Sequence, residues 1–460
     1  MNFTETEKQK IVSDMCRMIQ CKTVSNLDDS LVEWSEFEKF RALLKEIFPK
    51  IYSVCEFYKV GKTGIVHKIS GTDTGSAFGA SGAEKHAVVL MAHYDVVPAE
   101  KEKWSFEPFA GDVADGYIRG RGTMDTKGTL CACLEAVEAS LLSGWKPKKD
   151  LYLCFSGEEE INGATCSDIV AWFKTNGISV DFVLDEGGAI VENIFPGVGR
   201  RCAMIGTAEK GSVYMDLVVK GRSGHASAPP KHSAVGLAGK IICQIEKTPY
   251  KAEFTAPVKQ LFKIMGANNS NPALKFLFSN LWLTKPLIKL ISSSMGGELN
   301  ALLHTTCAVT MVEGSKSYNV LPSQAVIGMN FRLLGSDTVE KTKARIEKIA
   351  RKAVGKEAEI SIKLVSENNP SIESDADCEQ WNVLCGAIQK TWPDILVSPY
   401  LMMACSDSRH YCSITDKVYR FSGMFMSKED RAMIHGIDEK ISIETLLTTV
   451  EFYKNLLTGL

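Results

Sequence analysis

Histidine and acidic side chains follow apolar segments at several separate places in this 460-residue sequence. They are His93 and Asp95 around the end of KHAVVLMAHYD, Asp125 in GRGTMDTKG, Glu158, Glu159 and Glu160 after LYLCFSG, Asp185 and Glu186 after FVL, and His435 in MIHGIDEK. The carboxyl ends of strands line the ligand crevice of an open α/β sheet, so these side chains can meet there. Histidine combined with several carboxylates suits divalent cations of intermediate hardness, zinc above all, with manganese or cobalt as substitutes. The sequence therefore predicts a metal centre.

Strand geometry relates His93 to Asp95. Residues two apart on a strand point to the same face, so Asp95 can accept a hydrogen bond from the far nitrogen of His93. Such a contact fixes the tautomer of a metal-bound imidazole. Taken alone, a histidine in this position is more often a hydrogen-bonded residue of the core.

The run of three glutamates at 158–160 follows a predicted buried strand, where adjacent carboxylates repel one another unless a cation lies among them. Neighbours on an extended segment face opposite sides, so two of the three can reach one site. The ordinary alternatives are a solvated loop for this run, an N-cap for Asp125 and a turn for DEGG. The glycines of GRGTMDTKG invite a phosphate-loop interpretation, but that motif's lysine pattern and preceding strand are absent, which disfavours a nucleotide site.

The elements that position these residues alternate along the first two hundred residues. Strands are predicted at 86–93, 150–156 and 181–185, and helices at about 127–143 and 165–175, which favours an α/β sheet covered by helices on both faces. From residue 207, strands with one polar face, such as AVIGMNFRLL, and helices such as DTVEKTKARIEKIARKAVG predict an inserted α+β module. We expect a catalytic domain of residues 1–206 and 371–460, and an inserted domain of residues 207–370.

Composition limits the class of function. The 53 Lys and Arg residues nearly balance the 55 Asp and Glu residues, and a formal charge of -2 gives no general attraction to nucleic acid or acidic membranes. Small-molecule chemistry is the better expectation. The N-terminal segment lacks a secretory pattern and predicts a helix opened by a capping box of Thr4 and Glu7. Fourteen scattered cysteines without a C-x-x-C pair then suggest core residues in the reducing cytoplasm.

Segment 274–291, LKFLFSNLWLTKPLIKLI, is the most apolar long stretch. Three lysines and Pro286 interrupt it, so we expect one or two amphipathic helices and no membrane span. The wider segment 253–303 either lines a pocket for an acyl chain or an apolar side chain, or packs on the core of the inserted domain. The Gly/Ser-rich segment 71–82 predicts a surface loop.

Read in order, the motifs resemble a known family. HYDVVP, DGYIRGRGTMDTKG, EEEINGA, LDEGG, SGHAS, NVLPS, SDSR and IHGIDEKIS are similar to those of the di-zinc exopeptidases and aminoacylases, which include carboxypeptidase S and the N-fatty-acyl-amino-acid hydrolases. The similarity spans nearly the whole chain. It implies a zinc-peptidase sheet with an inserted lid or dimerisation domain, and two Zn²⁺ ions as cofactors.

The resemblance implies a role for each metal ligand. His93 and Asp185 would bind one zinc ion, Glu160 and His435 would bind the other, and Asp125 would bridge both. A cis peptide bond after Asp125 is implied as well.

The resemblance also makes Glu159 the general base, while Asp95 would orient the histidine of the first ion. Two ions about 3.5 to 4 Å apart lower the pKa of a water held between them toward about 7. Glu159 would take the proton of that water and return it to the leaving nitrogen. The family has Asp where this chain has Glu158, which leaves the pairs Glu158/Glu159 and Glu159/Glu160 open as base and ligand.

Three further residues resemble substrate-binding positions of the family. His225 in GRSGHASAP would stabilise the oxyanion, Arg409 in CSDSRHY would clamp the substrate's carboxylate, and Asn319 in SYNVLPS would hydrogen-bond the same group. Because His225 and Asn319 lie on the inserted domain, domain closure or a neighbouring subunit must complete the site. A homodimer through the inserted domain is therefore a candidate assembly.

We expect a metal-dependent amidohydrolase that cleaves the amide of an N-acyl amino acid or a short peptide with a free α-carboxylate. A dipeptidase of the same family is the alternative within this class. A catalytically silent metal-binding scaffold is the alternative from another class. The presence of Glu159, His225 and Arg409 argues against it, because a silent relative needs neither a base nor a clamp.

Overall fold

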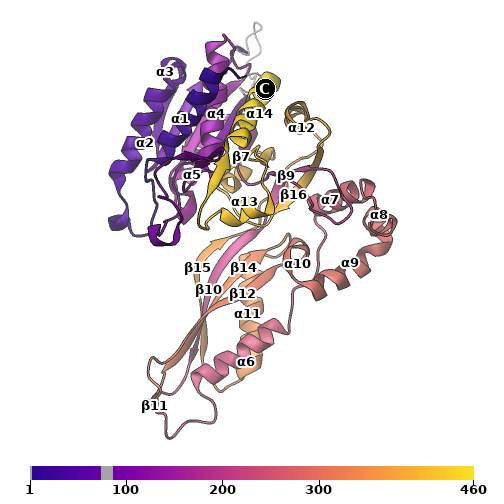
Figure 1. The fold of residues 1–460 in the computed structure, drawn as a ribbon. Coiled ribbons are helices and arrows are strands. Elements are labelled where there is room, and N and C mark those ends of the chain that lie inside the picture. Colours follow the sequence, from indigo (N-terminus) through magenta and orange to yellow (C-terminus); the bar gives the residue numbers. More distant parts are fainter. Residues whose placement is uncertain (1–2, 74–85) are drawn as a thin grey trace.

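A computed structural model describes residues 3–73 and 86–460, so most of the predicted surface loop at 71–82 lies outside the described residues. Figure 1 shows two parts, each built on its own sheet. The larger part carries a sheet with the strand order β1-β2-β6-β3-β7-β17-β9-β16. These strands are β1 (Glu56–Val60), β2 (Gly64–Ile69), β3 (His86–His93), β6 (Asp150–Ser156), β7 (Ser179–Asp185), β9 (Cys202–Glu209), β16 (Leu396–Met402) and β17 (Val418–Arg420).

The centre of this sheet is parallel. Strand β3 lies between β6 and β7 and runs parallel to both, so the carboxyl ends of the three strands meet at one edge of the sheet. The strands predicted at 86–93 and 150–156 have these bounds, and the third begins two residues earlier than predicted, at Ser179. Helices α4 (Lys127–Leu142) and α5 (Thr165–Thr175) confirm the predicted helices.

Alternation along the strands explains the two helical layers. Val88 and Leu90 of β3 point into one core together with α1 (Glu5–Ile19), α4, α12 (Glu379–Thr391) and α14 (Ile443–Gly459). Val89 and Met91 point to the other face, against α5. Helices therefore cover both faces, as predicted. The capping box of Thr4 and Glu7 opens α1.

Shorter elements surround this sheet. They are α2 (Trp34–Ile47), α3 (Pro49–Val54), α13 (Lys428–Met433), β4 (Val113–Ala114), β5 (Tyr117–Arg119), β8 (Ile190–Val191) and β18 (Lys440–Ser442).

The inserted part carries a second, antiparallel sheet with the strand order β12-β14-β10-β15. Its elements are β10 (Gly211–Lys220), α6 (Ala234–Glu246), β12 (Thr306–Glu313), β14 (Gln324–Leu333), α11 (Val339–Val354) and β15 (Ile360–Asn368), and the two helices share one core with the sheet. A short ribbon of β11 (Gly224–His225) and β13 (Val320–Leu321) lies at the end far from the larger part (Figure 1). The first sheet continues to Glu209 in β9, so the predicted boundary at residue 207 falls inside a strand and the chain changes sheet at Lys210.

Helices α7 (Ala256–Ala267), α8 (Pro272–Ser279), α9 (Leu281–Met295) and α10 (Gly297–Leu303) form a separate layer. Their buried residues, including Phe262, Phe278 and Ile288, belong to the core of the catalytic part. The interpretation that segment 253–303 packs on the core of the inserted sheet is therefore wrong. The two amphipathic helices expected at 274–291 are α8 and α9. Within the described residues, no helix combines the length and the apolar character needed to cross a membrane.

Candidate metal centre

The predicted histidines and carboxylates converge at the carboxyl edge of β6, β3 and β7. His93 is the last residue of β3, Glu160 lies in the turn after β6, and Glu186 directly follows β7. Asp125 lies in the loop before α4, and His435 lies in the loop after α13. Five segments that are far apart in the sequence thus supply one site.

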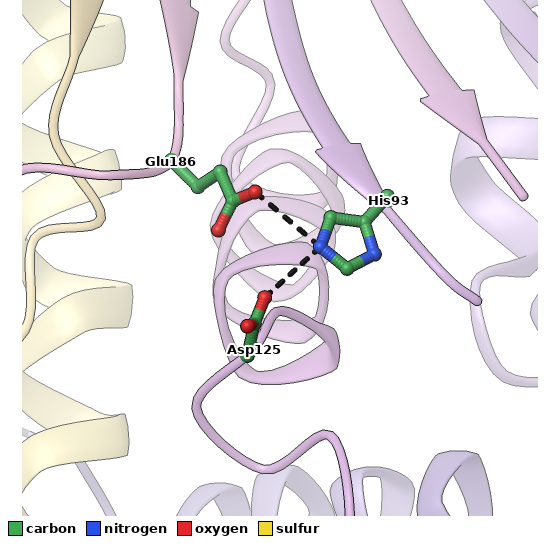
Figure 2. Close-up of side chains that lie close together, drawn as sticks. All are labelled: His93, Asp125 and Glu186. Carbon is green, nitrogen blue, oxygen red and sulfur yellow. Dashed lines mark hydrogen bonds and ion pairs between the residues drawn. The ribbon is translucent and has the colours of Figure 1, made fainter. Parts of the chain in front are cut away.

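The first group of ligands consists of His93, Asp125 and Glu186 (Figure 2). Nε2 of His93 lies 3.0 Å from Oδ1 of Asp125 and 3.3 Å from Oε1 of Glu186. One ligand atom of each residue lies within 4.8 Å of the others, so the group could hold one metal ion.

The second group shares Asp125 with the first. Nε2 of His435 lies 3.0 Å from Oδ2 of Asp125 and 3.0 Å from Oε2 of Glu160. Asp125 therefore offers one carboxylate oxygen to each group. Its backbone is also as expected, because the Asp125–Thr126 peptide bond is cis. Two cations that share one carboxylate would fit this arrangement.

Asp95 orients both ligand-bearing strand ends. Nδ1 of His93 makes a 2.9 Å hydrogen bond to the backbone oxygen of Asp95 and lies 3.4 Å from its Oδ1. The same fully buried carboxylate accepts hydrogen bonds from the backbone N–H groups of Glu159 and Glu160, at 3.2 Å each. Asp95 thus fixes the ring that carries Nε2 and the turn that carries the second group's glutamate.

Glu439, which the sequence interpretation missed, holds the loop of the shared carboxylate. Its fully buried side chain accepts a 2.6 Å hydrogen bond from Arg121 and accepts backbone N–H groups of Gly122 at 3.0 Å, Met124 at 2.8 Å and Asp125 at 3.3 Å. The sequence signal that could have identified Glu439 is the pair of acidic residues in the motif IDEK, which follows His435. One acidic side chain therefore ties the C-terminal motif to the glycine-rich loop.

The pKa values of the histidines and glutamates in the cluster are shifted by burial and by their mutual contacts. Burial acts to lower the pKa of His93, but the charge of Glu186 and the hydrogen bond with Asp125 raise it well above its usual value. Hydrogen bonds to Asp125 and Glu160 raise the pKa of His435 to about 10. Burial raises the pKa of Glu186 to about 8, and the charge of Asp125 adds to this. Burial also raises the pKa of Glu160.

These directions fit a site for divalent cations. Protons on the histidines and glutamates relieve repulsion among the buried carboxylates, and metal ions replace such protons when they bind. Oε1 of Glu160 is buried and has no hydrogen-bond partner, although a buried carboxylate oxygen normally has one. Imidazole nitrogen and carboxylate oxygen are ligands of zinc, manganese and cobalt. The residues therefore fit two divalent ions around Asp125.

The three adjacent glutamates point in different directions. Oε2 of Glu158 accepts a hydrogen bond from the hydroxyl of Thr165 at the start of α5, away from the cluster. Glu160 contacts His435. The register with Glu159 as base and Glu160 as ligand therefore agrees with the geometry better than the alternative.

Glu159 has the properties of a proton acceptor in a buried site. Among the described residues, its carboxylate has no hydrogen-bond partner. Burial raises its pKa well above the usual range, His93 opposes this, and the charges of Asp407 and Glu186 add to it. The carboxylate thus lies within electrostatic reach of the first ligand group.

The structure differs from the prediction at Asp185. Glu186, and not Asp185, contacts His93, because β7 ends at this point and neighbouring side chains face opposite sides. Oδ2 of Asp185 accepts a 3.0 Å hydrogen bond from the backbone N–H of Ser408 instead. In contrast to the prediction, the structure places Glu186, and not Asp185, among the candidate ligands, and Asp185 holds the segment that carries Arg409.

Arg409 lies in η4 (Asp407–Ser413), close to the ligand edge of the sheet. Its Nη1 donates to the backbone oxygen of Ser406 at 2.7 Å, and its Nη2 donates to Oδ1 of Asn162 at 3.3 Å. Nε is buried and has no hydrogen-bond partner. The guanidinium is thus anchored on one side and has donor capacity left for a substrate.

His225 and Asn319 are not brought to the metal ligands. Both are exposed, and they lie next to each other on the ribbon of β11 and β13 at the far end of the inserted part (Figure 1). The backbone oxygen of Asn319 accepts a 3.0 Å hydrogen bond from Ala226. The structure therefore places these two residues near each other, since His225 pairs with Val320, but leaves them away from the cluster.

An apolar cavity begins at the segment that follows β7. Its volume is about 650 Å³, and its wall starts at Gly187 and Gly188, which follow Glu186. Much of the wall comes from the segment 189–196 and from α7–α10, including Leu261, Leu277, Phe278, Ile288, Ile291, Leu299 and Leu302, and Met204, Tyr400, Met403, Lys428 and Arg431 also line it. Segment 253–303 thus lines this cavity.

Comparison with known proteins identifies the family. The family model described as "Peptidase family M20/M25/M40" matches residues 89–459. A probable carboxypeptidase S-like 2 of Dictyostelium discoideum is 33% identical over 99% of this chain and 86% of its own length. The N-fatty-acyl-amino acid synthase/hydrolase PM20D1 of Xenopus tropicalis is 30% identical over 99% of this chain and 86% of its own length.

Solved structures agree in fold. The M20 family metallo-carboxypeptidase Sso-CP2 of Sulfolobus solfataricus matches with a TM-score of 0.70, at 19% identity over 99% of both chains. The YXEP protein of Bacillus subtilis, a dinuclear metal-binding peptidase, matches with a TM-score of 0.59, at 14% identity over 99% of this chain and 98% of its own. The chain belongs to peptidase family M20/M25/M40. The expectation of a metal-dependent hydrolase from the carboxypeptidase S and N-fatty-acyl-amino-acid hydrolase branch is thereby confirmed.

The Glu439 contact predicts an effect on metal binding. Glu439→Gln removes the charge that holds Arg121 and the loop of Asp125, so metal affinity should fall about 10- to 100-fold. Competition titration against a chelator measures this affinity. Glu444→Gln, an exposed change at the start of α14, is the matched control. Equal affinities in both variants would contradict the role of Glu439.

Proposed function

We propose that this protein is a di-zinc amidohydrolase that cleaves the amide of an N-acyl amino acid or a short peptide with a free α-carboxylate. The observation that carries the proposal is the pair of ligand groups joined by Asp125, with Glu159 beside them. Mixed nitrogen and oxygen ligands favour zinc, and manganese or cobalt are possible substitutes. Two such ions, when bound, polarise the amide carbonyl and activate water.

The chain's own residues divide the remaining work. Glu159, whose carboxylate is free of hydrogen bonds within the described structure, takes a proton from the attacking water and gives it to the leaving nitrogen. Asp95 keeps His93 and the glutamate turn in place. Arg409 binds the substrate carboxylate through its uncommitted guanidinium edge.

The apolar cavity favours a substrate that carries an acyl group. The acyl group would lie at the end of the substrate opposite the carboxylate that Arg409 binds. A wall that starts at the residue after Glu186 can receive a chain attached to the scissile carbonyl. The frog relative's name, an N-fatty-acyl-amino acid synthase/hydrolase, supports the same substrate class. A dipeptidase is the second candidate, supported by the likeness of the fold to carnosine dipeptidase 1, at 14% identity and a TM-score of 0.64. A silent scaffold is disfavoured, because it needs neither Glu159 nor Arg409.

A substrate panel tests this function. The metal-loaded enzyme should hydrolyse N-acyl amino acids, lose that activity on chelation and regain it with Zn²⁺. Blocking the α-carboxylate as an amide should weaken kcat/KM by at least tenfold, because a charge-assisted pair is lost. Activity after complete metal removal would contradict the proposal, and a preference for dipeptides would favour the second candidate.

Replacement of the base separates chemistry from metal binding. Glu159→Gln should lower kcat by about 10²- to 10⁴-fold, because the proton acceptor is lost, while two metal ions stay bound. Steady-state kinetics and metal analysis of the same sample measure both effects. Glu158→Gln is the matched control, since that side chain faces Thr165. A severe loss of turnover in Glu158→Gln, together with normal turnover in Glu159→Gln, would instead support Glu158 as the base and Glu159 as the ligand.

The cavity predicts a dependence on chain length. Each methylene that enters an apolar wall contributes about 0.8 kcal/mol, so kcat/KM should rise about fourfold per methylene until the cavity is full. Assays of acetyl, octanoyl and oleoyl amino acids measure this trend. Leu277→Asp, within the wall, should flatten it without affecting acetyl substrates. A flat series in the unmodified enzyme would exclude an acyl pocket.

We also propose that His225 completes the site from a second subunit or after closure of the inserted part. Edge strand β12 exposes Met311 and Val312, at 57% and 53%, which supports pairing of two copies through this part. His225→Ala should lower turnover severely and leave both metal ions bound, since it touches no ligand.

Mixing inactive variants distinguishes the two routes. If His225 acts across a dimer, co-expressed His225→Ala and Glu159→Gln chains form heterodimers with one complete site, and activity returns. Closure within one chain predicts no recovery. Near-normal turnover of His225→Ala alone would contradict both routes.

A cytoplasmic location is proposed from the cysteines. All fourteen are free, and six of them are buried, which suits a reducing compartment. Fractionation of cells that express the native protein tests this, and recovery from the medium would contradict it.

A further inference from the structure

Five large apolar side chains on α8 and α9 are exposed. They are Phe276 at 56%, Trp282 at 81%, Leu283 at 53%, Leu287 at 50% and Leu290 at 67%, and they define the α8–α9 face. At about 100° per residue, the four positions on α9 share one side of the helix. Figure 1 places α8 and α9 at the outer side of the molecule. Several large exposed apolar side chains on one side of a helix are typical of an interaction site.

The opposite side of α9 already has a packing role. Thr284, Ile288 and Ser292 are buried, at 7%, 1% and 0% exposed. Ile288 and Ile291 also line the apolar cavity. Packing on the catalytic part therefore explains the inner side of α9 but leaves the apolar outer side without a partner among residues 3–73 and 86–460.

The segment that carries this face has charges of one sign, and Glu253 and Glu298 flank it in the sequence. Residues 254–297 contain five lysines and no Asp or Glu, in a chain whose overall formal charge is only -2. The lysines are Lys259, Lys263, Lys275, Lys285 and Lys289. Within the described part of the chain, no carboxylate forms an ion pair with any of them. Positive charge is thus concentrated beside the exposed apolar residues, which the overall charge does not reveal.

We propose that the α8–α9 face docks on the surface of an anionic phospholipid bilayer. The apolar side chains enter the boundary between headgroups and acyl chains, Trp282 occupies the interface, and the exposed Lys275 and Lys289 face the anionic headgroups. The charge argues against a second copy of this chain as the occupant, because a two-fold contact would place the same lysines opposite each other. Docking here also brings the outer wall of the cavity to the bilayer.

Vesicle flotation of the full-length, metal-loaded chain tests the apolar contact. The protein should float with phosphatidylcholine vesicles that contain phosphatidylserine. Trp282→Ser with Leu290→Ser should weaken this partitioning about tenfold or more, because two interfacial apolar side chains are removed. The matched control is Leu27→Ser with Leu142→Ser, whose side chains are 84% and 68% exposed elsewhere on the surface. Hydrolysis of a short, water-soluble substrate and thermal melting confirm that each variant is folded.

A second pair of variants tests the charge. Lys275→Gln with Lys289→Gln should weaken partitioning to the phosphatidylserine vesicles about 25-fold, at about fivefold per lysine, and should change binding to pure phosphatidylcholine little. Lys348→Gln with Lys352→Gln, two exposed lysines of α11, is the control. A higher salt concentration should weaken the binding of the unmodified protein to phosphatidylserine vesicles, as Lys275→Gln with Lys289→Gln does.

Three outcomes would overturn the proposal. The unmodified protein could fail to float with phosphatidylserine vesicles, or both control pairs could weaken flotation as much as the test pairs. Alternatively, Trp282→Ser with Leu290→Ser could halve the mass in sedimentation while vesicles bind neither form, which would make this face a contact between copies. None of these outcomes depends on which substrate the enzyme hydrolyses.

Discussion

The carboxylate of Asp125 is the contact on which the rest of the site depends. One of its oxygens lies 3.0 Å from Nε2 of His93 and the other lies 3.0 Å from Nε2 of His435, so it joins two groups of candidate ligands that come from separate segments of the chain. Around it lie further buried carboxylates, which cannot all be charged in a poorly solvated site unless cations are present. The pKa directions show the same conflict, since the histidines and Glu186 are all shifted toward their protonated forms.

The fold holds the ligand residues close together, despite the repulsion among their carboxylates, through contacts with residues that are not ligands. Parallel pairing brings the ends of β6, β3 and β7 to one edge, so the backbone alone places three ligand-bearing segments together. Asp95 then fixes the turn after β6, and Glu439 fixes the loop of Asp125. Both supporting carboxylates are fully buried, and each accepts hydrogen bonds from backbone N–H groups. Asp95 and Glu439 thus hold the two loops that carry candidate ligands.

Much of this could be predicted from local sequence patterns. The strand that ends at His93 is apolar, and the motif around Asp125 is specific, so the residues of the cluster and its supporting Asp95 could be found. Asp185 and Glu186 are adjacent acidic residues at the end of a strand. Which of the two faces the cluster depends on the residue at which the strand ends, and the sequence does not give that residue. Glu439 acts through three backbone N–H groups of a distant loop, which no spacing reveals. The sequences of helices α7–α10 do not indicate whether these helices pack on the core of the catalytic part or on that of the inserted part, because their apolar residues suit both.

The arrangement of ions around Asp125 is the central claim, and anomalous diffraction at the metal absorption edge tests it most directly. Crystals grown with Zn²⁺ should show two anomalous peaks per chain, one on each side of the Asp125 carboxylate and about 3.5 to 4 Å apart. The first should contact His93 and Glu186, and the second should contact His435 and Glu160. A single peak, or two peaks in separate pockets without Asp125 between them, would contradict the account.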